Sequence, residues 1–149
     1  MNLRTTPPTA PDPAAPNPSA RKVLLVEDNE DLRQLVALRL QRAGHDVRQA
    51  GSGPEGKNLA LSDPPDVVVL DIGLPDMDGY QLARELRSHD DLSDCLMIAL
   101  TGYSSAEAKA AARAAGFDAH LVKPVDLGEL KAVIERGRPP RAQNPAETG

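Results

Sequence analysis

The chain has 149 residues, a formal net charge of -5 and a single cysteine. This length allows one ordinary domain, and the acidic balance argues against nucleic acid as a direct partner, because phosphate backbones are met by clustered Lys and Arg. As the single cysteine, Cys95 cannot form an internal disulfide, which is consistent with a reducing, cytoplasmic location. No apolar run approaches the length of a membrane span or of a signal region, so we expect no membrane partner.

Both ends of the chain are rich in proline or small polar residues. Residues 1–20 contain six prolines and almost no large apolar side chains, so we expect a disordered arm. Residues 138–149 have a similar composition and are predicted to be a disordered tail. Residues 21–137 remain for one compact domain, which is long enough to build a hydrophobic core.

Apolar runs and helical spacings alternate along the first half of this domain. In chain order the sequence predicts a buried strand at 22–26, a helix carrying Leu32, Leu35, Val36 and Leu40 and ending at Gly44, a weaker strand at 46–50, and a helix that opens with a Ser52/Glu55 capping box and stops before Pro64-Pro65.

The second half opens with the most apolar strand of the chain, at residues 66–71, whose unbroken β-branched run is typical of a strand buried on both faces. The sequence then predicts a helix from about 79 to 88 with Asp78 and Gln81 as a capping pair, a strand at 96–100, an alanine-rich helix opened by Ser104 and Glu107 and ended by Gly116, a strand at 119–122, and a helix capped by Asp126 and Glu129.

Five β–α units with short connections require a parallel sheet with helices on both faces and right-handed crossovers. The fold class is therefore α/β, a three-layer doubly wound (βα)5 arrangement. We expect the flavodoxin-like strand order 2-1-3-4-5, a known order for such folds, which would make the polar second strand an edge.

Four of the five predicted strands end at a chemically reactive residue: Asp28, Asp71, Thr101 and Lys123. The carboxyl ends of parallel strands meet at one edge of a sheet, where open α/β folds bind their ligands. With strands one and three as neighbours, Glu27, Asp28 and Asp71 would crowd together and repel one another unless a cation lies among them. An all-oxygen ligand set with room for water suits Mg²⁺.

This combination of residues matches the needs of phosphoryl transfer. A metal-bound Asp71 stays ionised and can attack phosphorus, while Lys123 supplies a cation and Thr101 a hydroxyl donor for the phosphoryl oxygens. A single acidic residue after a strand is usually only an exposed polar cap, and we interpret Asp76 and Asp78 as solvated turn residues or a helix cap. All four strand ends, however, carry a residue of the type that phosphoryl transfer needs, and such a coincidence rarely arises by chance.

Residues 21–136 resemble the receiver domain of two-component response regulators, also described as CheY-like. The resemblance lies in the pair Glu27-Asp28, the segment 71–79 (DIGLPDMDG), Thr101 in the segment 99–102 (ALTG), and Lys123-Pro124.

The resemblance implies that a sensor histidine kinase or a histidine phosphotransfer protein donates a phosphoryl group to Asp71. It also implies Mg²⁺ held by Asp28, Asp71 and the Gly73 carbonyl, with Glu27 assisting. Lys123 would contact the phosphoryl group, and Thr101 would act as the switch residue. The Lys123–Pro124 bond would be cis.

One position departs from the family pattern. The second switch position, upstream of the lysine, is commonly Tyr or Phe in the family and is His120 here. The simpler interpretation is a half-exposed strand residue that still moves between two rotamers. The other is a switch whose packing depends on pH, because imidazole titrates near neutrality.

Three rival functions fit parts of the sequence. The segment 51–58 nearly spells a nucleotide-binding P-loop, but Asn58 replaces the metal-binding hydroxyl. A flavodoxin-like electron carrier shares the expected topology, yet Glu27-Asp28 would repel an anion in the loop after strand one. An aspartyl phosphatase needs a second Asp two residues after the first, where this chain has Gly73.

The sequence thus predicts a phosphoacceptor switch rather than an enzyme, in which phosphorylation alters the surface formed by residues 104–136, where a downstream partner would bind. We expect a monomer or a weak dimer. Two architectures remain open: a free-standing regulator, which Met1 favours, and a receiver of the kind fused to hybrid sensor kinases, for which the proline-rich arm would serve as a linker.

Overall fold

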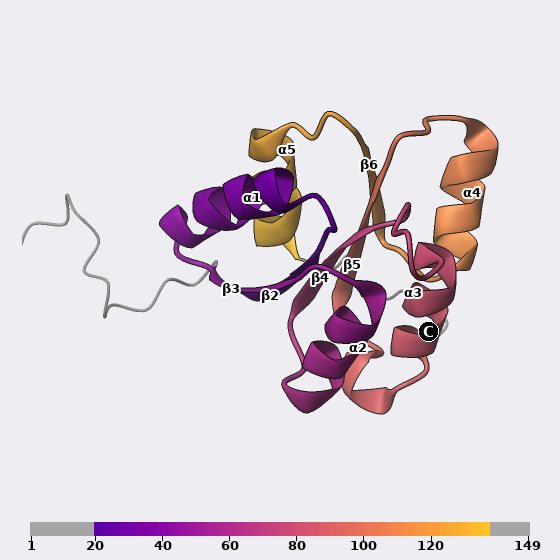
Figure 1. Cartoon of the computed structure of the whole chain (residues 1–149), viewed down its shortest axis with the longest axis horizontal. Helices are drawn as coiled ribbons and strands as arrows, with labels where there is room; N and C mark the ends of the chain where they lie inside the picture. The colour runs from indigo at the N-terminus through magenta and orange to yellow at the C-terminus, as the bar shows by residue number, and fades with distance from the viewer. Residues whose placement is uncertain (1–19, 138–149) are drawn as a thin grey trace, which may run out of the picture.

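The computed structural model describes residues 20–137, which form a central sheet between two layers of helices (Figure 1). The predicted arm at 1–20 and tail at 138–149 lie outside the described residues, apart from residue 20. No helix within residues 20–137 is long and apolar enough to cross a bilayer.

The strands and helices alternate along the chain, as expected for a doubly wound fold. Their bounds are β2 (Lys22–Val26), α1 (Glu30–Arg42), β3 (Asp46–Ala50), α2 (Gly53–Ser62), β4 (Val67–Asp71), α3 (Gly79–Arg87), a short 3-10 helix η1 (Asp90–Leu92), β5 (Leu96–Thr101), α4 (Ala106–Ala114), β6 (Ala119–Val122) and α5 (Leu127–Arg136).

The five strands are parallel and lie in the order β3-β2-β4-β5-β6, which confirms the predicted order 2-1-3-4-5. Strand β4 is central and buried at all five positions. Strand β3 lies at one edge with three exposed residues, which explains its polar sequence. Because β2 neighbours β4, the residues that follow these two strands meet at the same edge of the sheet.

Alternate residues of each central strand pack into two separate cores, because successive side chains of a strand point to opposite faces. In β4, Val67 and Val69 face the core covered by α1 and α5, whereas Val68 and Leu70 face the core covered by α2, α3 and α4 (Figure 1). This double burial is the reason why β4 is a continuous apolar run rather than an alternating one.

Most of the predicted helix starts are confirmed, and two details are wrong. Asp78 caps α3 by accepting from the Tyr80 N–H, but the Gln81 amide donates to Glu85 instead of completing a capping box. Helix α4 begins one residue later than predicted, since Ser105, not Ser104, accepts from the Ala108 N–H.

Helices α1 and α4 differ from ordinary amphipathic helices in the side chains that they bury. Helix α1 packs through Val36, Ala37 and Leu40, and leaves Leu35 and Leu38 49% and 42% exposed. Leu35, which the helical spacing had placed with the packing residues, therefore faces solvent. Helix α4 buries a single residue within its bounds, Ala112, and the alanine-rich sequence gives it little apolar surface to bury.

The glycines of the P-loop-like segment are explained by close packing in α2. A Cβ at Gly56 would lie 2.7 Å from Val26 Cγ2, and a Cβ at Gly53 would lie 2.8 Å from Met77 Cβ. Ser52 caps the helix by accepting from the Glu55 N–H. Each glycine thus lets α2 approach a neighbouring segment, and no phosphate is needed to account for it.

We expect Gly56→Ala to destabilise the domain by about 2 kcal/mol. A 2.7 Å contact with Val26 places the overpacking cost at the upper end of its usual range of about 1–3 kcal/mol, and the better helix propensity of alanine returns about 1 kcal/mol. Chemical denaturation would measure this loss. Asn58→Ala, an exposed position of the same helix, is the matched control and should stay within about 0.5 kcal/mol of the wild type. Equal stabilities of the two variants would contradict the packing explanation.

Arg87, near the end of α3, holds three segments together. Its guanidinium donates to the carbonyl oxygens of Leu92, Cys95 and Gly116, at 3.2 Å, 2.6 Å and 2.6 Å. It also forms a 2.8 Å ion pair with Asp118, and both side chains are less than one-fifth exposed. One side chain therefore fixes η1, the start of β5 and the loop before β6.

Candidate functional site

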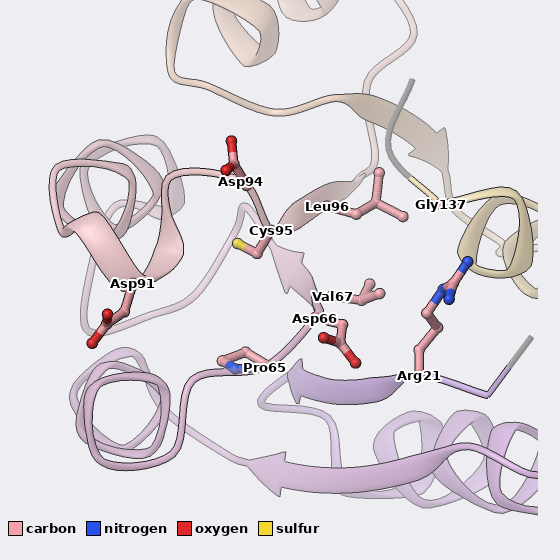
Figure 2. Close-up of a pocket in the computed structure, with 9 residues that line it drawn as sticks. All are labelled: Arg21, Pro65, Asp66, Val67, Asp91, Asp94, Cys95, Leu96 and Gly137. Atoms are coloured by element: carbon pink, nitrogen blue, oxygen red, sulfur yellow. The ribbon is translucent and has the colours of Figure 1, made fainter. Parts of the chain in front are cut away.

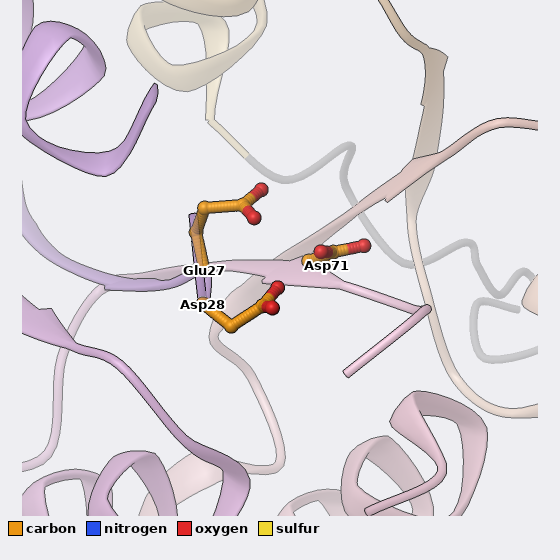
Figure 3. A group of neighbouring side chains, drawn as sticks. All are labelled: Glu27, Asp28 and Asp71. Atoms are coloured by element: carbon orange, nitrogen blue, oxygen red, sulfur yellow. The ribbon is translucent and has the colours of Figure 1, made fainter. Parts of the chain in front are cut away.

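Three carboxylates gather at the carboxyl edge of the sheet (Figure 3). Glu27 and Asp28 directly follow β2, and Asp71 ends β4. One oxygen of each lies within 4.8 Å of the others, close enough to share a metal ion. Glu27 and Asp71 are buried, at 1% and 5% exposure, whereas Asp28 is exposed. The structure thus brings together the three carboxylates that the sequence placed here.

Hydrogen bonds from backbone N–H groups fix the two buried carboxylates. Glu27 Oε2 accepts from the Asn29 N–H at 3.0 Å, and Asp71 Oδ1 accepts from the Gly73 N–H at 2.9 Å. Their other oxygens both face Lys123, whose ammonium lies 3.1 Å from Glu27 Oε1 and 3.1 Å from Asp71 Oδ2. Lys123 therefore reaches across from the segment after β6 and bridges the two acids.

Burial and the neighbouring charges together determine the pKa values of Glu27 and Lys123. Loss of solvent raises the pKa of Glu27, the negative charge of Asp71 raises it further, and the bonds from Asn29 and Lys123 offset only part of the effect. Burial alone would lower the pKa of Lys123, but the hydrogen bonds and charges of Glu27 and Asp71 outweigh it and raise that pKa. Lys123 is therefore held as a cation, while the acids still repel each other.

Thr101, the last residue of β5, completes the set and is 2% exposed. Its Oγ1 accepts from the Tyr103 N–H at 3.1 Å. Thr101, Lys123 and the three carboxylates all line one open cavity of about 550 Å³, together with Gly73. The carboxyl ends of β2, β4 and β5 and the segment after β6 thus supply the predicted combination of acids, hydroxyl and ammonium.

Four residues that the sequence interpretation did not single out also line this cavity: Asn29, Ile72, Gly102 and Tyr103. Asn29 has a sequence signal, because it caps α1 by accepting from the Leu32 N–H. Tyr103 is 73% exposed and stands at the rim. Each of the four directly follows or lies two residues after a predicted site residue, and that proximity is the signal that could have found them.

The donor set fits a hard divalent cation. Carboxylate oxygens beside a roomy cavity are the ligands that Mg²⁺ takes while it keeps several waters. The raised pKa of Glu27 adds a physical reason, because a cation near Asp28 and Asp71 would relieve the repulsion that Lys123 only partly offsets. The acidic cavity therefore fits the Mg²⁺ site that the resemblance to receiver domains implies.

The structure also describes the other predicted positions, Pro124 and His120. The Lys123–Pro124 peptide bond is cis. His120 is half-buried in β6, paired in register with Ala99 of β5, and it does not line the acidic cavity. The structure therefore separates His120 from the carboxylates, while it leaves both interpretations of its role as predictions.

A second cavity, of about 330 Å³, opens at the opposite edge of the sheet (Figure 2). Its charged groups already hold the backbone: Arg21 donates to the Ile134 and Glu135 carbonyls, and Asp66 accepts from the Lys22 N–H. The carboxylates of Asp91 and Asp94 are turned away from Asp66 (Figure 2). These groups do not converge on one point, in contrast to the acidic cavity.

Comparison with known proteins agrees with this geometry. The family model of the response regulator receiver domain matches residues 23–135. The chain is 33% identical over 113 residues to the DNA-binding dual master transcriptional regulator RpaA of Synechocystis sp., covering 76% of this chain and 47% of that protein. It is 36% identical over 122 residues to the response regulator MprA of Mycolicibacterium vanbaalenii, covering 79% of this chain and 52% of that protein.

Solved structures show the same fold. The chemotaxis response regulator CheY4 of Vibrio cholerae superposes with a TM-score of 0.74 at 32% identity, covering 77% of this chain and 96% of that one. The Francisella response regulator 1452 receiver domain gives a TM-score of 0.71 at 28% identity, covering 78% and 97%. The chain spans about half the length of the first curated relatives that it matches. By fold, by sequence and by the edge at which its acids meet, the chain belongs to the response regulator receiver domain family of two-component systems.

Proposed function

We propose that Asp71 is the phosphoacceptor of this receiver domain and that it takes its phosphoryl group from a phosphohistidine. One observation carries the proposal: the Lys123 ammonium lies 3.1 Å from Asp71 Oδ2 inside a cavity that Thr101 and two more carboxylates also line. An acid nucleophile, a cation and a hydroxyl donor facing one space are what phosphoryl transfer requires.

The proposed transfer balances as a single displacement. A carboxylate oxygen of Asp71 forms the new bond to phosphorus while the bond between phosphorus and the imidazole nitrogen of the donor breaks, and the electron pair of that bond stays on the nitrogen. Lys123 and the Thr101 hydroxyl neutralise the charge on the transferred oxygens. Mg²⁺, held by Glu27, Asp28, Asp71 and the Gly73 carbonyl, would neutralise further charge and orient the phosphoryl group.

Incubation with acetyl phosphate and Mg²⁺, followed by intact mass measurement, tests the proposal. We expect the protein to gain one phosphoryl group in the presence of Mg²⁺ and none when EDTA removes the metal, because the crowded acids would then repel the incoming anion. A protein that gains no phosphoryl group with Mg²⁺ present would contradict the proposed function. A gain that EDTA leaves unchanged would contradict the role given to the metal.

We further propose that the phosphorylated domain acts as a switch, without turnover of its own beyond slow loss of the phosphoryl group. Contacts from Thr101 and Lys123 to the phosphoryl oxygens would shift the population toward a second state and alter the surface of residues 104–136. A downstream partner would bind that surface. The cytoplasmic location and the monomer or weak dimer expected from the sequence stay predictions.

The exposed surface of helix α1 supports the proposal that the phosphoryl donor is a protein. It begins two residues after Asp28, so its first turns flank the mouth of the acidic cavity. Its exposed Leu35 and Leu38 lie three residues apart, on one side of the helix. A sensor histidine kinase or histidine phosphotransfer protein that brings its histidine to Asp71 must pass this helix, and the two leucines give it an apolar contact.

We therefore expect Leu35→Glu to slow phosphotransfer from a phosphorylated histidine kinase at least about fivefold, since the loss of one anchoring apolar contact is worth more than about 1 kcal/mol. The rate with acetyl phosphate should not change, because that donor needs no docking surface. The control is Leu61→Glu, which changes another exposed leucine, on α2, that is 37% exposed. Equal slowing by both variants would reject α1 as the docking helix.

A further inference from the structure

A second group of charged side chains surrounds a cavity between α4 and β6. This cavity measures about 160 Å³ and is lined by Lys109 and Arg113 of α4, Asp118 of the preceding loop, and His120 of β6. A single water needs about 10–15 Å³ of such volume, so the cavity has room for several heavy atoms. It can therefore admit a side-chain carboxylate.

His120 is poorly satisfied in this position. Both ring nitrogens are shielded from solvent, and neither has a hydrogen-bond partner in another residue of the described chain. Buried polar groups normally have a partner, because leaving one unpaired costs free energy. An imidazole that lines a cavity and has no partner in another residue of the described chain is thus suited to a ligand that supplies hydrogen bonds to it.

The charges around His120 are mainly positive. Lys109 and Arg113 are four residues apart, so they project from the same side of α4. Asp118 is the one carboxylate among the lining residues, and its Oδ2 already accepts from Arg87 at 2.8 Å and from the Met97 N–H at 2.9 Å. Burial lowers the pKa of His120 and the charge of Lys109 lowers it further, so both effects favour the neutral ring.

We propose that this cavity binds an acidic side chain of the downstream partner, whose carboxylate accepts hydrogen bonds from Lys109, Arg113 and His120. The inference rests on the proposed function, because the cavity lies within the surface of residues 104–136. Charge complementarity carries it: Lys109 and Arg113 line the cavity, and its one carboxylate is already paired with Arg87, so the local charge attracts an acidic side chain and disfavours a basic one.

The site also makes the interaction sensitive to pH. A bound carboxylate favours the protonated imidazole, which has two N–H donors, and by linkage protonation of His120 strengthens carboxylate binding by the same factor. Lowering the pH from 7.5 to 5.5 should therefore tighten binding, because a Glu side chain with an ordinary pKa near 4.3 remains ionised over that range. Without a partner the same protonation is unfavourable, since His120 would face Lys109 and Arg113.

A titration with the synthetic peptide acetyl-Ala-Glu-Ala-Glu-Ala-amide tests the proposal, with the ring nitrogens of His120 observed by ¹⁵N NMR. We expect the peptide to shift both ring signals and to bind about tenfold more tightly at pH 5.5 than at pH 7.5. The matched peptide with Gln in place of Glu should not shift them. His120→Phe, which keeps an aromatic ring, should remove the pH dependence, and Lys109→Ala should weaken binding at both pH values.

Arg42→Ala removes an exposed cation on α1, away from the cavity, and should bind like the wild type. Equal binding of the Glu and Gln peptides, or an unchanged pH profile in His120→Phe, would overturn the proposal. So would displacement of the peptide by an equal concentration of inorganic phosphate, which indicates a simple anion site. Phosphorylation of His120→Phe by acetyl phosphate, measured in parallel, reports on the function of Asp71 independently of the peptide.

Discussion

Asp71→Asn should abolish the gain of a phosphoryl group from acetyl phosphate, because an amide oxygen is a poor nucleophile and cannot carry the charge that directs the metal. The substitution should not unfold the domain. An Asn at this position can still accept from the Gly73 N–H at its 2.9 Å separation, and it removes a negative charge that raises the pKa of Glu27. We therefore expect the variant to be at least as stable as the wild type.

Asp76→Asn is the matched control for this experiment. Asp76 is exposed in the loop after β4 and does not line the acidic cavity. Intact mass should show one added phosphoryl group for the control and the wild type, and none for Asp71→Asn. A phosphorylated Asp71→Asn protein would place the acceptor on another side chain, with Asp28 as the next candidate to replace.

Arg87→Met should destabilise the domain by about 3 kcal/mol. The substitution keeps much of the side-chain volume but leaves the carbonyl oxygens of Cys95 and Gly116 without their 2.6 Å donors. It also removes the cation 2.8 Å from the Asp118 carboxylate. Loss of one partner from a mostly buried pair costs more than the pair contributes, because the remaining charge stays desolvated.

Denaturant midpoints would measure this effect, with Arg84→Met as the control on the exposed side of the same helix. The control should stay within about 0.5 kcal/mol of the wild type. Adding Asp118→Asn to Arg87→Met should recover part of the loss, because it removes the uncompensated charge. An Arg87→Met protein as stable as its control would show that the hydrogen bonds of Arg87 contribute little net free energy.

The acidic cavity could be predicted from the sequence because its residues follow from strand order. Once β2 and β4 are neighbours and parallel, the residues after Val26 and at Asp71 must meet at one edge. The apolar runs identify these strands without ambiguity, since each is buried on both faces. Lys123 and Thr101 follow by the same reasoning from β6 and β5.

Features that depend on details of packing could not be predicted in this way. Ser104 and Ser105 both have the chemistry of a helix cap, and only the path of the loop after β5 selects Ser105. Arg87 looks like an exposed residue at the end of an amphipathic helix, because all its partners lie outside the helix and two of them, Gly116 and Asp118, are 29 and 31 residues away. The cavity beside His120 likewise requires the position of α4 on the sheet.

The scant burial of α4 has a consequence for how the domain moves. With Ala112 as the single buried residue within the helix bounds, α4 has few apolar contacts to lose when it separates from the sheet. Local opening free energies follow such contacts, so the amides of α4 should exchange with solvent at lower cost than those of the buried strand β4. The helix beside the His120 cavity can therefore open and reclose many times within one lifetime of the folded domain.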